Sequence, residues 1–596
     1  MKKLINSIIV AMLVLASGCS SSKKVTNEGI YTAGVYSASA KGFGGNVTVT
    51  ITVDSNSITA VEIDGADETE NVGQASFDEF KEQIISAQSA EIDGVSGATF
   101  TSDAVKEATA SALATAKGEE IGTDDSVSFT AGTYSTTVKG MGGDMEVSVS
   151  VSNDKITDIT VGENKETQMV GTEALRILSE RIVETQSLGV DAVTGATVTS
   201  NAFISAVSDC VSQAGGNVAA MKAREVGKLY DYSDKTHEAD IIIVGGGLAG
   251  ISAAISATEN GGNVILLEYK EYLGGNSVLS TGNYLLGGGN SIQTANGITD
   301  DTLDSFIKWQ MEDSDNKKTI EQCTMVAENS QTVIDWLTNM GVVFDDEMSN
   351  TDGSDIQRTL TVSPNIATGV SPMIDYMNKL GVDVRYGTKV TGFVVEDGEL
   401  KGVKATDYNG DEVEYYGKDI ILASGGWGDN NDMIVKYWGK EYDGLVYGGS
   451  KGMDGTMLLA AMDTFDADTV DMDDKHIDAT LDVTRGITVT TNIVRNAGGI
   501  LIRQSTGKRF VDEQASHSEK AATAMHEIGD EYYYEIFDNN ALNYNDSVTY
   551  KVNSYINMGL TTQYDSIEDM ADGIGVDPEV LTETIENYNT IVRGEA

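Results

Sequence analysis

Ile241-Ile-Ile-Val-Gly-Gly-Gly-Leu-Ala-Gly250 predicts a buried strand that runs into a glycine turn and then into a helix of small residues. Within this segment Gly245, Gly247 and Gly250 have the spacing G-x-G-x-x-G. In a dinucleotide site the first glycine makes the tight turn, the second admits the pyrophosphate and the third lets helix and strand pack closely. The segment therefore predicts a dinucleotide-binding domain of the α/β class.

A second apolar strand, Asn263–Leu267, ends at Glu268, eighteen residues beyond Gly250. An acidic side chain at the tip of this strand can accept hydrogen bonds from both ribose hydroxyls of a dinucleotide. The N-terminus of the intervening helix offers free N–H groups and a positive dipole end to the phosphates. Together these features make the glycine spacing a specific prediction.

The composition limits the classes of function. The 596 residues predict several domains, and 40 Lys+Arg against 92 Asp+Glu leave a formal charge of −52. Such acidity argues against nucleic-acid binding and against adhesion to anionic lipid by charge. The hydrophobic content of 40% is that of a globular protein.

The chain has three cysteines, Cys19, Cys210 and Cys323, and no C-x-x-C-H motif. Covalent haem is therefore not expected, and no cysteine cluster could hold zinc or an iron–sulfur centre, so no metal site is predicted. Cys210 lies in an apolar helical pattern, which favours a packed thiol over a reactive one.

The first 19 residues predict an export signal. Lys2 and Lys3 precede the apolar run Leu4–Leu15, which is short for a membrane span. Ala16-Ser17-Gly18-Cys19 resembles a bacterial lipobox, which would make Cys19 the lipidated first residue of the mature protein. We therefore expect an exported protein held at the extracytoplasmic face of the cell membrane by a lipid anchor.

An internal repeat follows with an offset of 98 residues. Thr32-Ala-Gly-Val-Tyr36 recurs as Thr130-Ala-Gly-Thr-Tyr134, and Asp93-Gly-Val-Ser-Gly-Ala-Thr99 recurs as Asp191-Ala-Val-Thr-Gly-Ala-Thr197. One offset at separated places indicates two copies of one small domain. Alternating strands open each copy and a helix closes it, with Ser102 and Ser200 as the expected N-caps, so the class is α+β.

The motif Asp-x-x-(Ser/Thr)-Gly-Ala-Thr resembles the site at which a flavin transferase attaches FMN to threonine through its phosphate. The resemblance implies two FMN-binding domains with covalent FMN on Thr99 and Thr197. A helix N-terminus beside each threonine would stabilise the phosphate charge. A tight turn that only caps a helix is the alternative interpretation of the same residues.

The order of motifs from Gly245 to Asp454 resembles the flavoprotein family of fumarate reductases and succinate dehydrogenases, in particular its exported fumarate and urocanate reductases. This resemblance implies that FAD occupies the dinucleotide site. The implied cofactor-binding residues are Gly245, Gly247, Ala249, Gly250, Glu268, Gly274, Gly275, Asn276, Ser277, Thr281, Gly282 and Asp454.

From about residue 476 the chain resembles the family's capping domain, which closes over the substrate. The implied catalytic residues are His476, Thr491, Arg495 and His517. The proton-donating arginine of the family falls on His517, and a glycine beside the substrate falls on Asn283. Arg503, Lys508 and Arg509 are interpreted as solvated or structural.

The domains are therefore predicted as a signal peptide, two FMN-binding domains, a linker, an incomplete FAD-binding domain and a capping domain, at 1–19, 27–117, 126–214, 215–238, 239–475 and 476–596. A further family segment, which supplies a histidine and an arginine for the substrate carboxylate, is not found before Ala596. A fragment or interrupted reading frame is our expectation.

The predicted function is flavin-dependent reduction of an activated C=C bond in an unsaturated acid such as urocanate, fumarate or an aryl acrylate, in anaerobic respiration. The expected partners are the acid, a flavin transferase, and a membrane quinol or surface electron donor. Two alternatives remain open: a flavin relay without substrate turnover, and a ketosteroid-type dehydrogenase.

Overall fold

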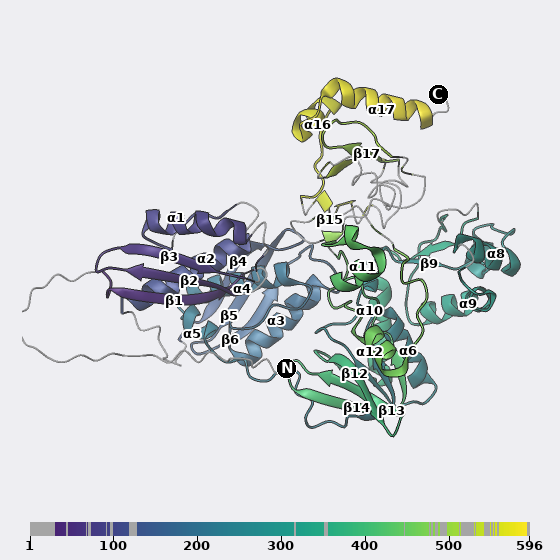
Figure 1. Cartoon of the computed structure of the whole chain (residues 1–596), viewed down its shortest axis with the longest axis horizontal. Helices are drawn as coiled ribbons and strands as arrows, with labels where there is room; N and C mark the ends of the chain where they lie inside the picture. Colours follow the sequence, from purple (N-terminus) through teal and green to yellow (C-terminus); the bar gives the residue numbers. More distant parts are fainter. Residues whose placement is uncertain are drawn as a thin grey trace, which may run out of the picture. The chain divides into compact units, whose positions relative to one another are not determined.

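Figure 1 shows the computed structural model of the chain, which divides into two compact units, Met1–Thr123 and Asp124–Ala596. The structure describes residues 30–592 except for 43–45, 67, 69–72, 91, 96–98, 119–127, 315–316, 351–355, 446, 476, 478–480, 483–486, 489–497, 512, 514–529, 531, 541–548, 550–551, 554 and 557–558. Each unit is described separately below.

The first unit contains a three-stranded antiparallel sheet in the order β1-β2-β3, with two helices. The strands are β1 (Gly34–Lys41), β2 (Asn46–Val53) and β3 (Ile58–Asp64), and the helices are α1 (Phe77–Ala87) and α2 (Thr99–Ala116). In β2 the side chains alternate between buried and more exposed, as expected for a sheet that is covered by helices on one face.

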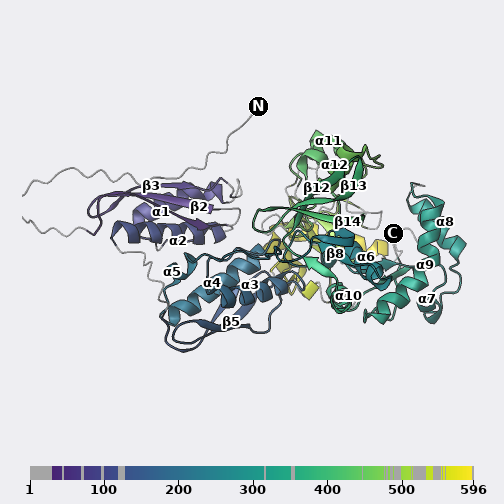
Figure 2. The same cartoon turned by 90° about the horizontal axis from the view of Figure 1, so that it is seen from below.

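The second unit begins with the same arrangement. Its strands are β4 (Gly132–Lys139), β5 (Asp144–Val151) and β6 (Ile156–Val161), and its helices are α3 (Gly171–Thr185) and α4 (Thr197–Gln213). Figure 2 shows α3 and α4 side by side along this sheet. The predicted duplication of an α+β domain is thereby confirmed.

The expected N-caps of the closing helices are wrong. Helix α2 begins at Thr99 and helix α4 at Thr197, three residues before Ser102 and Ser200. The two serines instead lie inside the first turn, where their hydroxyls accept hydrogen bonds from the preceding loop, Val95 N–H and Val193 N–H, both at 3.1 Å. Thr99 and Thr197, the predicted attachment threonines, are therefore the first residues of the helices.

The segment predicted as a linker contains the short helix α5 (Val218–Lys222). It is hydrogen-bonded to the predicted FAD-binding domain, residues 239–475, which is called the flavin half below. Leu229 and Asn409 exchange two hydrogen bonds, at 3.1 and 2.9 Å. The Tyr232 hydroxyl accepts from Tyr386 N–H at 2.9 Å. These contacts order the chain between the second repeat and the first strand of the flavin half.

A six-stranded sheet in the order β11-β8-β7-β14-β13-β12 organises the flavin half. The parallel strands are β7 (Glu238–Val244), β8 (Val264–Leu267), β11 (Asp383–Arg385) and β14 (Glu412–Leu422), while β12 (Lys389–Glu396) and β13 (Glu399–Thr406) complete it as an antiparallel extension. This is the predicted Rossmann-like α/β fold.

Alternate residues of β7 enter two different apolar cores. Ile243 belongs to the core that includes Ile251 of α6 (Leu248–Glu259), whereas Ile242 and Val244 belong to a core with Met457 of α12 (Thr456–Phe465). Because both faces of the sheet are covered, β7 and β8 are continuous apolar runs instead of alternating ones. This burial fixes the end of β7, where the glycine turn begins.

Besides the six-stranded sheet, the flavin half contains further helices and the short two-stranded sheet of β9 and β10. Helices α8 (Leu303–Asp313) and α9 (Ile320–Asn339) pack against each other, with Ile334 and Leu337 buried. The other elements of this region are β9 (Asn283–Leu285), α7 (Ser291–Ala295), β10 (Thr359–Thr361), α10 (Ala367–Leu380) and α11 (Asn431–Trp438).

The last part of the chain is described in pieces. These are the pairs β15 (Leu481–Asp482) with β16 (Ile487–Thr488) and β17 (Ile500–Arg503) with β18 (Tyr533–Ile536), followed by α16 (Ile567–Ile574) and α17 (Pro578–Val592). Proline suits the first position of α17, because it lacks the N–H that a first helical turn does not need. Among the helices that the structure describes, none has the length and apolarity needed to cross a membrane.

Candidate functional site

The glycine turn after β7 has the three geometric roles that its spacing predicts. Gly245 has a φ of +103°, which favours glycine. A Cβ on Gly250 would lie 1.8 Å from the carbonyl oxygen of Gly245, so only glycine lets α6 approach the strand. A Cβ on Gly247 would meet nothing within 4 Å, which leaves open space for a bound group beside the backbone.

The N-terminus of α6 faces this open space. Gly247 is its N-cap and carries no side chain, so it supplies no capping oxygen to the first-turn N–H groups. From outside the helix, the Ser277 hydroxyl accepts a long hydrogen bond from Leu248 N–H at 3.4 Å. A helix start whose N-cap residue has no side chain is suited to the negative charge of a phosphate.

Glu268 follows β8 and is 8% exposed. One carboxylate oxygen accepts from Gly246 N–H at 2.6 Å and the other from Lys270 N–H at 2.8 Å. Burial raises the pKa of this carboxyl above its ordinary value, against the lowering effect of these backbone hydrogen bonds. Each oxygen keeps a further lone pair, so the predicted role toward ribose hydroxyls stays a prediction.

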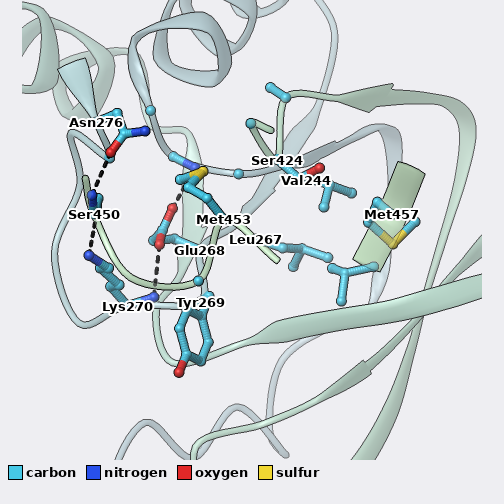
Figure 3. Close-up of a pocket in the computed structure, with 18 of the residues that line it drawn as sticks. Val244, Leu267, Glu268, Tyr269, Lys270, Asn276, Ser424, Ser450, Met453 and Met457 are labelled. Carbon is cyan, nitrogen blue, oxygen red and sulfur yellow. Dashed lines mark hydrogen bonds between the residues drawn. The ribbon is translucent and has the colours of Figure 1, made fainter. Parts of the chain in front are cut away.

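A single cavity runs from the glycine turn past Glu268 (Figure 3). The predicted cofactor residues that line it are Gly245, Gly247, Ala249, Glu268, Gly275, Asn276, Ser277 and Asp454. Open space at Gly247, a helix start whose N-cap has no side chain, and an acidic strand tip are what the pyrophosphate and ribose of a dinucleotide require. The residues present therefore fit the dinucleotide part of FAD.

Other predicted cofactor residues lie beside the lining. Gly250 packs behind the turn, and Gly274 forms a parallel bridge with Gly247. Thr281 and Gly282 are not part of the lining, although Gly282 has a φ of +80° and its carbonyl accepts from Val362 N–H at 3.0 Å. Their contact with FAD stays a prediction.

Lys270, which the sequence pattern did not single out, is a buried base in the cavity wall. Its ammonium donates to the Ser450 hydroxyl, and Ser450 N–H donates to Asn276 Oδ1 at 2.6 Å (Figure 3). Burial lowers the pKa of Lys270 to about 8, although the carboxylates of Glu268 and Asp429 act in the opposite direction. Its place two residues after the acidic strand tip was the only available signal.

Asp454 and Asn283 are held by neighbouring side chains. The Asp454 carboxylate accepts a hydrogen bond from the Thr456 hydroxyl at 2.6 Å and forms an ion pair with the Lys389 ammonium at 2.8 Å. Burial alone would raise the pKa of Asp454, but these two partners help to hold it below its ordinary value. Asn283 Oδ1 accepts from the Thr361 hydroxyl at 2.9 Å. Asn283 is thus tied to the short sheet of β9 and β10.

All residues of the predicted second FMN-attachment motif, 191–197, lie within the described part of the chain. Thr197 opens α4, and its N-cap Ala196 offers no side-chain hydrogen bond. Gly195 has a φ of +88°, which explains the glycine of the motif. In the first repeat Thr99 opens α2 in the same way, but its side chain lies outside the described residues.

A buried glutamate supports each attachment helix. Glu166 accepts from the Thr199 hydroxyl and from Gly142 N–H, the latter at 2.8 Å. In the first repeat Glu68 accepts from the Thr101 hydroxyl at 2.5 Å. Because each glutamate is 3% exposed, it joins the helix start to the loops of its own domain.

The predicted catalytic residues His476, Thr491, Arg495 and His517 all lie outside the described residues, as does Cys19. Nearby, Arg503 forms two hydrogen bonds with the Asp530 carboxylate, both at 3.0 Å, and Arg509 Nε donates to Glu513 Oε2 at 2.8 Å. The structural interpretation of these two arginines is confirmed.

Comparison with known proteins places both cofactor sites in known families. Residues 240–596 match the family model described as FAD binding domain, and residues 42–114 and 140–212 match the FMN-binding domain. The predicted cofactors, FAD and FMN, are thereby confirmed.

Two curated relatives and one solved structure are similar to this chain. It is 28% identical over 467 residues to the NADH:fumarate oxidoreductase of Klebsiella pneumoniae, with 78% of this chain and 48% of that protein covered. It is 28% identical over 464 residues to the urocanate reductase of Eggerthella lenta, with 76% of each covered. The chain therefore spans about half the length of the Klebsiella relative.

The fold is similar to the open conformation of a flavocytochrome c3 fumarate reductase, with a TM-score of 0.50, 24% identity, and coverage of 61% of this chain and 63% of that one. The family model described as FAD binding domain covers more than half of the sequence, so the chain belongs to that family. It carries two FMN-binding domains ahead of the FAD-binding domain.

Proposed function

We propose that this flavoprotein reduces an activated C=C bond of a small unsaturated acid, and that electrons reach FAD through the FMN groups on Thr99 and Thr197. The observation that carries the proposal is the joining of two FMN-binding domains to one FAD-binding domain in a single chain. The names of its relatives, a fumarate oxidoreductase and a urocanate reductase, support an enoate as the substrate class.

The described residues bind and orient the cofactor in this proposal. The open backbone at Gly247 and the uncapped start of α6 hold the pyrophosphate, while Glu268 binds the ribose. When bound, FAD supplies the hydride that adds to one alkene carbon. The buried walls beside Lys270 and Ser450 keep water from the cofactor.

The substrate side of the proposal rests on residues outside the described part. Arg495, with His476 and Thr491, would hold the acid's carboxylate and stabilise the charge that develops on it as hydride arrives. His517 would donate the proton to the second alkene carbon, because an imidazole titrates near neutral pH.

We further propose export and lipid anchoring through Cys19. Lys2, Lys3 and the apolar run Leu4–Leu15 support export, and the small residues before Cys19 support lipid attachment. A flavin transferase would then load FMN on the exported chain, and a membrane quinol or surface protein would supply electrons.

The test is turnover by the full chain, loaded with FAD and with both FMN groups by a co-expressed flavin transferase. A reduced viologen dye serves as donor, and fumarate, urocanate and aryl acrylates form the acceptor panel. Acid-dependent oxidation of the dye is the expected result. Absence of turnover with every acid, in protein that retains FAD and FMN, would contradict the proposal and favour a flavin relay.

His517→Ala tests the assigned proton donor. A general acid contributes about a hundredfold or more to the rate, so the variant should lose that factor while it keeps its flavins. Lys508→Ala, at an exposed position, is the matched control. Equal rates for the two variants would remove His517 from the reaction.

A further inference from the structure

Within the second unit, one buried ion pair joins the second FMN-binding domain to the FAD-binding domain. Arg181 of α3 donates to Glu271 at 2.6 Å, with side chains that are 4% and 3% exposed. Burial alone would lower the pKa of Arg181, but the Glu271 carboxylate raises it above its ordinary value. If either partner of such a buried pair is removed, the other charge is left buried without compensation, which is strongly destabilising.

Aromatic side chains of the connecting segment 215–238 and of the flavin half contact the guanidinium. Its carbon lies 5.9 Å from the ring centre of Tyr230 and 5.6 Å from that of Tyr408, and these two rings meet edge to face at 5.4 Å. Arginine stacks well on such rings. The carboxylate and the two tyrosine rings around Arg181 therefore form a site that favours a guanidinium.

The same carboxylate contacts the FMN-attachment loop. The second oxygen of Glu271 accepts from Thr194 N–H at 3.3 Å, three residues before Thr197. At the next residue, a Cβ on Gly195 would lie 2.8 Å from the Tyr272 hydroxyl and 3.1 Å from the Lys270 ammonium. The attachment loop thus lies directly on the segment Glu268–Tyr272.

That segment is also a wall of the FAD cavity. Glu268, Tyr269 and Lys270 line the cavity, while Glu271 and Tyr272 contact the FMN-binding domain. Within five consecutive residues, some side chains line the cofactor cavity and others contact the loop that precedes Thr197. A shift of the domain must act on the cavity wall, because the backbone is shared.

The first FMN-binding domain lacks the arginine. At the repeat offset of 98 residues, Gln83 occupies the place of Arg181. The Gln83 amide donates to Glu79 of its own helix at 3.2 Å. A neutral amide cannot replace the guanidinium opposite a buried carboxylate.

We propose that Arg181 and Glu271, a pair that the first repeat lacks, are positioning residues that seat the second FMN-binding domain on the FAD cavity, and that this seating strengthens FAD binding. The inference rests on the proposed function only in its assignment of Thr197 as an FMN-attachment site. The seating and its coupling to FAD are properties of the described contacts.

The experiment compares Arg181→Gln with Arg176→Gln in the full chain with both FMN groups attached. Arg176 lies on the same helix and forms ion pairs with Glu173 and Glu180, but its side chain is 53% exposed, so it is a matched control. Hydrogen exchange of the segment Glu268–Tyr272 and of the loop at Thr194 is measured, together with the dissociation constant of FAD.

Arg181→Gln should raise exchange in both segments and weaken FAD binding by about 5- to 150-fold, the range of typical coupling between sites. Arg176→Gln should match the wild type. Exchange in β5 and β7 reports whether both domains remain folded, and Arg181→Lys replaces Arg181→Gln if they do not. Wild-type exchange and FAD affinity in a folded Arg181 variant would overturn the proposal.

Neither measurement uses an unsaturated acid. If the proposed reaction fails, no acid is reduced but the coupling between Arg181 and FAD persists. If the seating fails, the coupling is lost although turnover can remain. The two failures are therefore distinguishable.

Discussion

The two FMN-binding repeats have the same fold, and corresponding residues differ by the constant offset of 98. Gly34 pairs with Val53 in the first and Gly132 pairs with Val151 in the second. In each sheet the pairing with the third strand shifts in register immediately before that valine. The side chains of Gln88 and Gln186 close each domain by bonding to the backbone of Ile58 and Ile156.

Their surroundings differ. Among the described residues, the apolar core of the first repeat is formed by side chains of that repeat, such as Ile51 and Phe80. The core of the second repeat continues into the FAD-binding domain, where it includes Ile251 and Leu273. The duplication thus gave two domains of one fold, and in the second a few residues such as Arg181 are buried against the FAD-binding domain.

The comparison is tested most strongly at the attachment threonines. Thr197→Val and Thr99→Val should each lower the covalent FMN content by one equivalent, because valine keeps the shape but lacks the hydroxyl that bears the phosphate. Intact-mass measurement of each variant and of the double variant checks this. Retention of both FMN groups in either single variant would contradict the assignment.

A smaller effect is expected from Lys270, which Gly195 of the second repeat covers. With a pKa of about 8 in the folded protein against 10.5 unfolded, the unfolded chain binds more protons between these values, so stability rises with pH across that window. The full change is about 3 kcal/mol, at 1.36 kcal/mol per unit.

This pH dependence is measured as the opening free energy of the FAD-free flavin half by hydrogen exchange. Lys270→Met should abolish the rise, and Arg181→Gln should reduce it by admitting water to the ammonium. An unchanged pH dependence in Lys270→Met would show that another group is responsible.

The buried glutamates should give equal effects in the two repeats. Glu166→Ala and Glu68→Ala each leave a buried threonine hydroxyl without its acceptor, at a cost of about 2 kcal/mol. Local opening free energies at α4 and α2 provide the measurement. A large effect in only one repeat would mean that the two attachment helices are supported differently.

The smallest effect isolates the contact of the attachment loop with the flavin half. Gly195 and Gly215 have φ values of +88° and +80°, but a Cβ on Gly215 would meet nothing within 4 Å. Both alanine variants pay for the left-handed backbone, so the extra destabilisation of Gly195→Ala, about 1 kcal/mol, reports crowding against Tyr272 and Lys270. Equal destabilisation would show that the loop does not press on this segment.

Local patterns in the sequence determined the repeats, the glycine turn and the class of each domain. A glycine spacing between an apolar strand and a helix has one compact solution, which the contact of Gly250 with Gly245 displays. Likewise, Pro578 marked the start of α17, because proline lacks the N–H that a first helical turn does not need. Such signals act within a few residues of chain.

Only the tertiary structure decided the helix starts and the partners of buried charges. Ser102 and Ser200 resemble N-caps, yet each bonds to a loop seven residues away and the helices begin earlier. The pairing of Arg181 with Glu271 joins residues 90 positions apart. Which distant charges are buried together depends on how the domains pack, because the desolvation that makes the pair necessary exists only in the folded chain.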